Sequence, residues 1–249
     1  MLAPLVEEIK AMKIPPFRLE AHRGASGAFP ENTLLAFTKA REAGALSIET
    51  DLSLLGDGSL AVFHDGTLGR TVAGDASLDT LTGAEIGGMD AGAWRGAEFA
   101  GETVPLLEDL LDWQAGTGMR FNLEMKCHGG RQGEAASALA AQLGGIQPGL
   151  TMVSSFDAAF IAAVRTTLPA LPRALICEKL PEDWQNLAAK LELEAFHLDK
   201  DIVTADMVGA LHAAGLRVRV WTVNEASDMK RMIDAGVDTV ITDVPEAFL

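Results

Sequence analysis

The chain has 249 residues, 48% of them hydrophobic, so it can bury a sizeable core within one domain. It contains no run of 18 or more apolar residues, which predicts that no helix crosses a membrane. The formal net charge of −15 disfavours long anionic polymers, so we expect no nucleic-acid partner.

The start of the chain and the cysteines together indicate the compartment. Residues 1–16 lack the basic start and apolar run of a secretory signal, and their apolar positions fit one face of a short helix. Cys127 and Cys177 lie outside any CxxC pair, so neither a disulfide framework nor a zinc site is expected. We therefore expect a cytoplasmic protein without stable membrane association.

Short β-rich runs alternate with helical patterns from end to end. The expected strands lie near residues 17–22, 46–53, 119–125, 150–154, 173–177, 195–199, 216–222 and 238–242. The helical patterns between them lie near residues 32–43, 105–115, 131–143, 157–167, 181–191, 204–214 and 225–235. Most strands are apolar throughout, which is typical of parallel strands covered on both faces. Eight of them predict a closed TIM (β/α)8 barrel, with an open doubly wound sheet as the alternative.

One segment interrupts the alternation. Residues 66–104 are rich in Gly, Asp and Ala, and a structureless loop of that length is improbable in a compact domain. We expect a small inserted subdomain there, over one mouth of a barrel that otherwise occupies 1–249 as a single domain. Before it, a Gly-Asp-Gly turn predicts a hairpin between 46–53 and 60–64.

The last strand leaves no room for a full eighth helix. The expected N-terminal helix is the candidate to cover that part of the barrel.

Acidic residues gather where two neighbouring strands of the predicted barrel end. Glu49 and Asp51 are two residues apart, so their side chains share one face, and Glu124 on the next strand adds a third acid. Buried carboxylates are costly unless they are protonated, paired or bound to metal. The three together predict a divalent cation with oxygen ligands, such as magnesium, calcium or manganese, rather than zinc or copper. The alternative is pairing with Arg23 and Lys126.

Two histidines lie at other strand ends. His22 and His64 can each donate or accept a proton near neutral pH. Phosphodiester cleavage needs one group to activate the attacking oxygen and another to protonate the departing alcohol, which predicts these two as the catalytic pair. Arg23 and Lys126 are candidates for binding phosphate oxygens. Asp65 either orients His64 or starts the turn that follows it.

Three further residues are candidates for substrate contacts. Asn32 follows Pro30 and Glu31, and it either points into the site or caps the first helix. Trp221 and Phe156 lie at strand ends, where each could pack against a small polyol or belong to the core. We assign no catalytic role to the remaining histidines, His128, His197 and His212.

In this order, the motifs resemble the glycerophosphodiester phosphodiesterase family. No single motif is specific for this family, but the ordered set of motifs, with an insertion after His64, is specific for it. The matching runs are His22-Arg23-Gly24, Pro30-Glu31-Asn32-Thr33, Glu49-Thr50-Asp51, His64-Asp65 with Arg70-Thr71, Leu123-Glu124-Met125-Lys126, Trp221-Thr222-Val223-Asn224 and Ile241-Thr242-Asp243-Val244-Pro245.

The resemblance implies a TIM barrel with a small insertion, and cleavage of glycerophosphodiesters to sn-glycerol 3-phosphate and an alcohol with magnesium or calcium. The chain is similar to the cytoplasmic bacterial members. The segment 127–130 matches no pattern of the family. The residue roles that the resemblance implies are metal ligation by Glu49, Asp51 and Glu124, acid–base catalysis by His22 and His64, and phosphate contacts from Arg23 and Lys126.

The sequence leaves several alternatives open. The nucleophile is either water or the glycerol 2-hydroxyl, which would first give a cyclic phosphate. The alcohol, the oligomeric state and the histidine that acts as the acid are not specified. Other functions are a cyclising barrel phospholipase at a membrane, which the acidic charge and the missing basic amphipathic helix disfavour, and a non-catalytic polyol-phosphate-binding barrel. The complete set of competent catalytic and metal positions argues against the latter.

Overall fold

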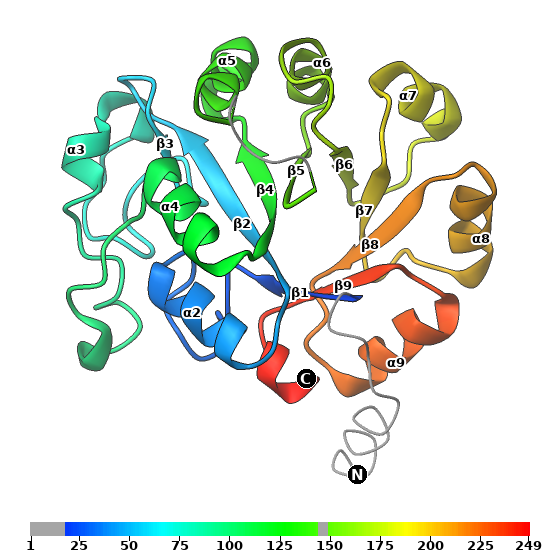
Figure 1. The fold of residues 1–249 in the computed structure, drawn as a ribbon, viewed down its shortest axis with the longest axis horizontal. Helices are drawn as coiled ribbons and strands as arrows, with labels where there is room; N and C mark the ends of the chain where they lie inside the picture. The colour runs from blue at the N-terminus through cyan, green and yellow to red at the C-terminus, as the bar shows by residue number, and fades with distance from the viewer. Residues whose placement is uncertain (1–17, 144–148) are drawn as a thin grey trace.

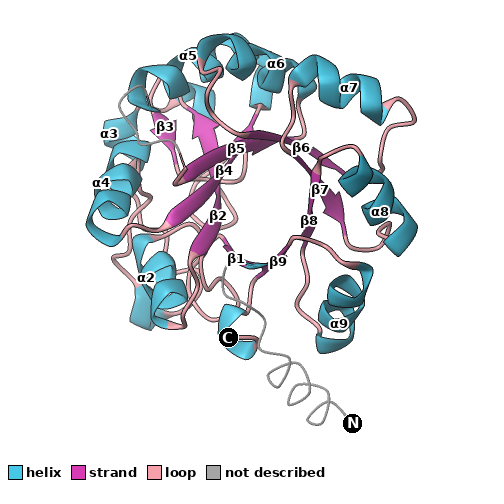
Figure 2. Cartoon of the chain, turned by 45° about the vertical axis from the view of Figure 1, so that its right-hand side comes forward, coloured by secondary structure: helices cyan, strands magenta, loops and turns pink. Residues whose placement is uncertain are grey.

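The computed structural model describes residues 18–143 and 149–249 and shows a closed barrel of eight parallel strands (Figures 1 and 2). Each strand pairs with its neighbours around the ring, and the pairing of β1 with β2 closes it, so the TIM barrel is confirmed and the open sheet is wrong. In the order of the ring the strands are β1 (Leu19–His22), β9 (Thr239–Thr242), β8 (Arg217–Trp221), β7 (Ala195–Asp199), β6 (Arg173–Cys177), β5 (Thr151–Ser155), β4 (Arg120–Lys126) and β2 (Ser47–Leu54).

Helices surround the barrel on its outer side (Figure 2). After β9 the chain forms only a short 3-10 helix at Pro245–Ala247, as expected, and the predicted N-terminal helix lies outside the described residues. No helix in the described ranges is both long and apolar enough to span a membrane. The helices that alternate with the strands are α2 (Leu34–Glu42), α4 (Leu107–Thr117), α5 (Gln132–Leu143), α6 (Ala158–Thr167), α7 (Trp184–Leu191), α8 (Ala205–Ala213) and α9 (Ala226–Ala235).

The predicted hairpin strand at 60–64 is shorter than expected. Strand β3 covers only Leu60–Ala61, antiparallel to the end of β2. Beyond Ala61 the Phe63 amide still donates to the Asp51 carbonyl at 3.1 Å, while the Val62 amide donates to the Pro105 carbonyl, 2.8 Å away. The chain is thereby drawn toward the start of α4.

The excursion between β3 and α4 lies to one side of the barrel (Figure 1) and has its own apolar cluster. Leu68, Leu78 and Ile86 are buried in this cluster, and Met89 packs against it. Trp94, by contrast, is 40% exposed and contributes no core. The regular elements of the excursion are 3-10 helix Leu78–Thr80, α3 (Gly83–Ile86) and 3-10 helix Ala97–Phe99.

The lumen of the barrel is polar below the strand ends. Arg219 on β8 is paired with Glu20 on β1, although β9 separates these strands in the sheet. The side chains of Asn122 on β4 and His197 on β7 also meet, with 3.5 Å between nitrogens, so both pairs reach across the lumen. His197 is therefore a buried lumen residue. These polar side chains form a floor beneath the mouth.

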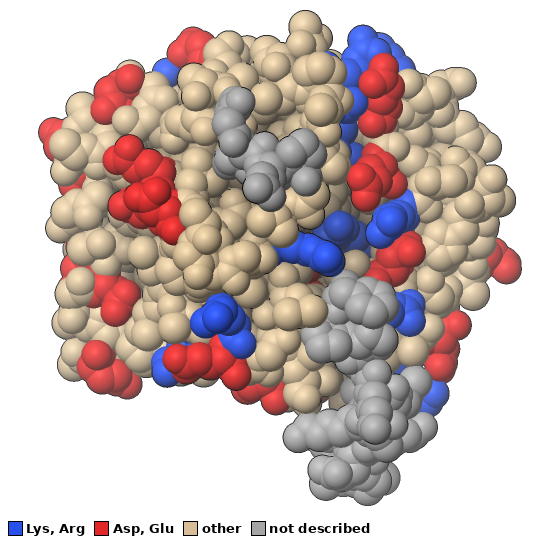
Figure 3. Space-filling model, in the orientation of Figure 1, with Lys and Arg blue, Asp and Glu red and all other residues tan. Residues whose placement is uncertain are grey.

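Acidic side chains are scattered over the face of the molecule seen in Figure 3 and interspersed with basic ones. The visible face has no continuous basic surface.

Gly24 fixes the loop that follows β1 against α2. Its φ is +85°, and a Cβ there would lie 2.6 Å from the Ala36 carbonyl carbon. The Ala25 amide donates to the Ala36 carbonyl at 3.0 Å, which holds the two backbones together. This contact sets the position of the preceding residue, Arg23.

We predict that Gly24→Ala costs more stability than Gly44→Ala. Both glycines have positive φ, so alanine at either position costs about 1–2 kcal/mol. At Gly24 the added Cβ would also clash with the backbone of Ala36, and this overpacking adds a cost of about 1–3 kcal/mol. At Gly44 nothing lies within 4 Å of the added Cβ. Urea denaturation of the two variants measures the difference in the free energy of unfolding. Equal losses would contradict the close approach.

Candidate active site

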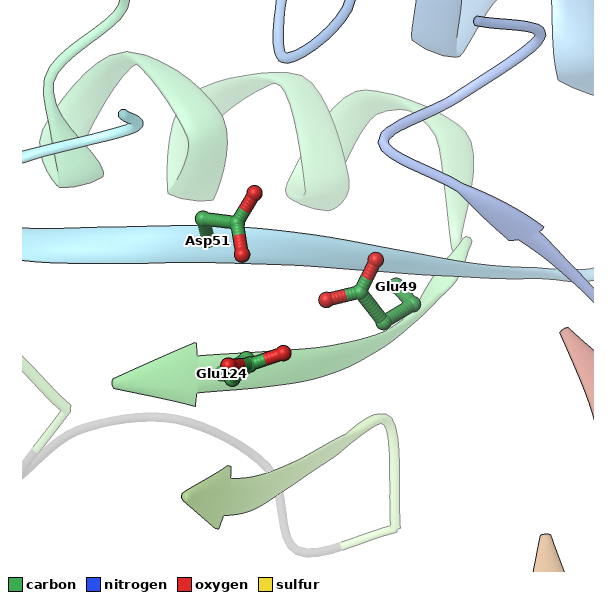
Figure 4. Close-up of side chains that lie close together, drawn as sticks. All are labelled: Glu49, Asp51 and Glu124. Atoms are coloured by element: carbon green, nitrogen blue, oxygen red, sulfur yellow. The ribbon is translucent and has the colours of Figure 1, made fainter. Parts of the chain in front are cut away.

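Three carboxylates converge at the mouth of the barrel (Figure 4). Glu49 and Asp51 come from β2, and Glu124 comes from β4, where the strand register sets it opposite Asp51. All three side chains are buried, and one oxygen from each lies within 4.8 Å of the others. The three acids predicted from spacing are thus brought together.

Of the three carboxylates, Asp51 has the most neighbouring groups that compensate its negative charge. Its Oδ2 is 2.9 Å from Arg23 Nε and accepts a hydrogen bond from Asn32 Nδ2 at 2.8 Å. Its Oδ1 is 3.1 Å from Lys126 Nζ. Burial alone would raise the pKa of Asp51, but the charges of Arg23 and Lys126 hold it well below its usual range. Asp51 therefore favours its ionised form at neutral pH.

Glu49 and Glu124 lack that compensation. Burial, together with the negative charge of Asp51, raises the pKa of both. Glu124 is paired with Lys126, but Glu49 Oε1 is buried without a hydrogen-bond partner among the described residues. Basic neighbours thus neutralise part of the cluster and leave Glu49 Oε1 with neither a hydrogen bond nor an ion pair among the described residues. An all-oxygen donor set with such a vacancy in its hydrogen bonding fits a hard divalent cation.

The loop after β1 adopts strained backbone to serve this cluster. Arg23 and Asn32 have φ of 56° and 58°, a region that costs non-glycine residues about 1–2 kcal/mol each. The Arg23 amide donates to the Glu49 carbonyl at 2.7 Å, and the Asn32 amide donates to the Arg23 carbonyl at 3.0 Å. Thr33, rather than Asn32, caps α2, so the Asn32 side chain is left to contact Asp51. Strain of this kind clusters at functional sites.

His22 is oriented by a carboxylate from the opposite end of the chain. Its Nδ1 lies 2.6 Å from Asp243 Oδ1, just beyond β9, and its Nε2 lies 3.8 Å from Glu49 Oε2. Asp243 also accepts hydrogen bonds from Ser26 and Asn224. Burial would raise the pKa of Asp243, yet these partners and His22 lower it to about 2. The Nδ1 contact turns the other nitrogen of His22 toward the acidic cluster.

His64 is held by a chain of ion pairs. Its Nδ1 lies 2.7 Å from Asp65 Oδ1, so Asp65 orients it. Arg70 donates to Asp65 at 2.7 Å and, through two nitrogens at 2.8 Å, to Glu31. Glu31 in turn accepts from Arg23 at 2.8 Å, which links the His64 side of the site to the Asp51 side. Burial lowers the pKa of His64, so its imidazole is uncharged at neutral pH.

A cavity of about 230 Å³ opens between these groups. One side is lined by the two histidines, Arg23, Glu49, Glu124 and Lys126, and the other side by residues that include Phe156, Glu178 and Trp221. The Phe156 and Trp221 rings meet edge to face with 5.6 Å between centroids, and Lys126 Nζ lies 5.8 Å from the Phe156 centroid. All ten residues singled out from the sequence as site candidates therefore lie in or directly beside one cavity: His22, Arg23, Asn32, Glu49, Asp51, His64, Glu124, Lys126, Phe156 and Trp221.

Sequence reasoning left out several participants. Asp243 directly follows a barrel strand, and functional residues of TIM barrels lie at such strand ends, so its position could have identified it as a site residue. The sequence did not show that it pairs with His22. Glu31 and Arg70 lie in loops 39 residues apart, and no spacing pattern predicts their ion pair. Glu178 follows β6 without any motif around it.

Several known proteins that resemble this chain are described as glycerophosphodiester phosphodiesterases. Residues 22–247 match the glycerophosphoryl diester phosphodiesterase family. The glycerophosphodiester phosphodiesterase of Caldanaerobacter subterraneus is 34% identical over 234 residues, with 92% of this chain and 95% of that protein covered. The Bacillus subtilis enzyme of the same description is 31% identical over 268 residues, with 100% and 91% covered. An Oleispira antarctica phosphodiesterase, solved in complex with the product sn-glycerol-3-phosphate, superposes with a TM-score of 0.89 at 31% identity, with 96% of each chain covered.

Proposed function

The chain belongs to the glycerophosphoryl diester phosphodiesterase family, and we propose that it hydrolyses glycerophosphodiesters to sn-glycerol 3-phosphate and an alcohol with a divalent cation, magnesium or calcium. The family match covers residues 22–247, and the structure of the Oleispira antarctica relative holds this product. The observation that carries the proposal is the arrangement of His22 and His64 around the buried acidic cluster, each with Nδ1 bound to its own carboxylate.

The phosphate binds between the acidic cluster and the basic side chains in this account. Glu49, Asp51 and Glu124 would hold the cation, which would neutralise negative charge on the phosphate. Arg23 and Lys126 bind other phosphate oxygens. Their carboxylate partners fix them in place, so little reorganisation accompanies binding.

The two histidines divide the proton transfers. A carboxylate at Nδ1 keeps a proton on that nitrogen and leaves Nε2 of each ring for the substrate. His64 acts as the base toward the nucleophile, either water or the glycerol 2-hydroxyl, because burial disfavours a positive charge on it. His22 protonates the leaving alcohol, and Asp243, whose Oδ1 lies 2.6 Å from Nδ1, orients the ring for that transfer.

Release of sn-glycerol 3-phosphate from glycerophosphocholine and glycerophosphoethanolamine tests the proposed activity. We expect EDTA to abolish release and magnesium or calcium to restore it. His22→Ala and Glu49→Ala should each lower the rate by about 10²-fold or more. His212→Ala, which removes an exposed histidine on α8, serves as the control and should leave the rate unchanged.

Release that EDTA leaves intact would contradict the role of the cation. No release with any metal would favour a polyol-phosphate-binding barrel or a different phosphodiester.

Asp243→Asn should lower kcat by about 10–100-fold, because the partner that orients His22 is weakened while the ring remains. KM should change little, since Asp243 does not line the cavity. The matched control is Asp234→Asn on the exposed side of α9, where the carboxylate pairs with Lys230 alone among the described residues. Steady-state kinetics of both variants are the measurement, and a wild-type kcat for Asp243→Asn would rule out an orienting role.

A further inference from the structure

The cavity has two chemically different sides. The catalytic groups come from β1, β2, β4 and the loop after β3. The opposite side is built at the ends of β5, β6 and β8 by Phe156, Glu178 and Trp221, and the proposed chemistry uses none of these residues. A diester whose phosphate lies at the catalytic side extends one of its two substituents toward this second side.

Glu178 differs from the other carboxylates of the cavity. It is exposed and forms no hydrogen bond or ion pair with any described residue. Glu49 accepts a hydrogen bond from the Arg23 amide, and Glu124 pairs with Lys126. Glu178 is thus the one acidic residue of the cavity lining, within the described ranges, that has neither a hydrogen bond nor an ion pair with another described residue.

A neighbouring hollow offers no equivalent. It is lined in part by Lys126, Phe156 and Asp157. Asp157 Oδ1 accepts from the Ala159 and Phe160 amides, and its Oδ2 accepts from Gln132 at 2.7 Å. That carboxylate is therefore occupied by the cap of α6, and Glu178 remains the available negative charge.

The aromatic pair beside Glu178 adds a second feature. Phe156 is 48% exposed, so its ring presents area to a ligand, and Trp221 meets it edge to face. Aromatic faces attract cations, particularly when a carboxylate lies nearby to complete the charge balance. Lys126 already lies near the Phe156 ring, but Asp51 and Glu124 neutralise it, so its repulsion of a second cation is small.

We propose that Glu178, Phe156 and Trp221 recognise a positively charged amino alcohol, so that zwitterionic glycerophosphodiesters are preferred over diesters with a neutral alcohol. The inference rests on the proposed function and specifies its substrate class. The cation of the alcohol lies against the two rings with Glu178 as its counter-charge, while the phosphate occupies the catalytic side.

The test compares Glu178→Gln with wild type on glycerophosphocholine, glycerophosphoethanolamine and glycerophosphoglycerol. We expect the variant to raise KM for the two cationic substrates by about 3–30-fold with little change in kcat, and to leave glycerophosphoglycerol unaffected. Glu178→Asp, which keeps the charge, should restore part of the affinity. Glu182→Gln removes a charge from the same loop outside the cavity and should match wild type.

The outcomes separate this proposal from the one on which it rests. Wild-type turnover of all three diesters with equal kcat/KM, or an equal KM increase for all three in Glu178→Gln, would overturn the cation site and leave the activity standing. The second of these results would assign Glu178 to the glycerol hydroxyls. Absence of turnover of every diester would overturn both.

Discussion

The burial of three carboxylates in one small space is the constraint on which the rest of this structure depends. Glu49, Asp51 and Glu124 lie within hydrogen-bonding reach of a common point, and removing such charges from water is expensive. Arg23 and Lys126 balance part of that charge. The uncompensated part raises the pKa of Glu49 and Glu124, and Glu49 Oε1 has no hydrogen-bond partner among the described residues. Three carboxylates beside two basic side chains lack one positive charge, and a cation from solution can supply it.

The surrounding fold holds the three carboxylates and their basic partners in this arrangement. The left-handed backbone of Arg23 and Asn32 brings a guanidinium and an amide onto Asp51, and the close approach at Gly24 holds this loop against α2. Beneath the mouth, ion-paired and hydrogen-bonded side chains fill the lumen, where barrels ordinarily place branched apolar residues. These groups pair with one another rather than with the acidic cluster, although Glu20 Oε2 and His197 Nε2 have no hydrogen-bond partner among the described residues.

Much of this arrangement could be read from local sequence. The alternation of strands and helices predicted the barrel, and the two-residue spacing of Glu49 and Asp51 predicted their shared face. What could not be read depends on contacts between distant loops. The pairing of Asp243 with His22 needs ring closure, and the link between Glu31 and Arg70 needs the path of the excursion. The hairpin strand was overestimated because its backbone beyond Ala61 bonds to Pro105 as well as to Asp51, and no local pattern reveals the contact with Pro105.

Cation binding by the acidic cluster is tested most directly by isothermal titration of magnesium and calcium into the protein, beside Glu49→Gln. The account predicts saturable binding of at least one ion per chain by the wild type and loss of that binding in the variant. Because burial favours the uncharged form of Glu49, the variant should be as stable as the wild type in EDTA, which separates lost ligation from misfolding. Binding that is unchanged by Glu49→Gln, or no binding of either ion by the wild type, would contradict the account.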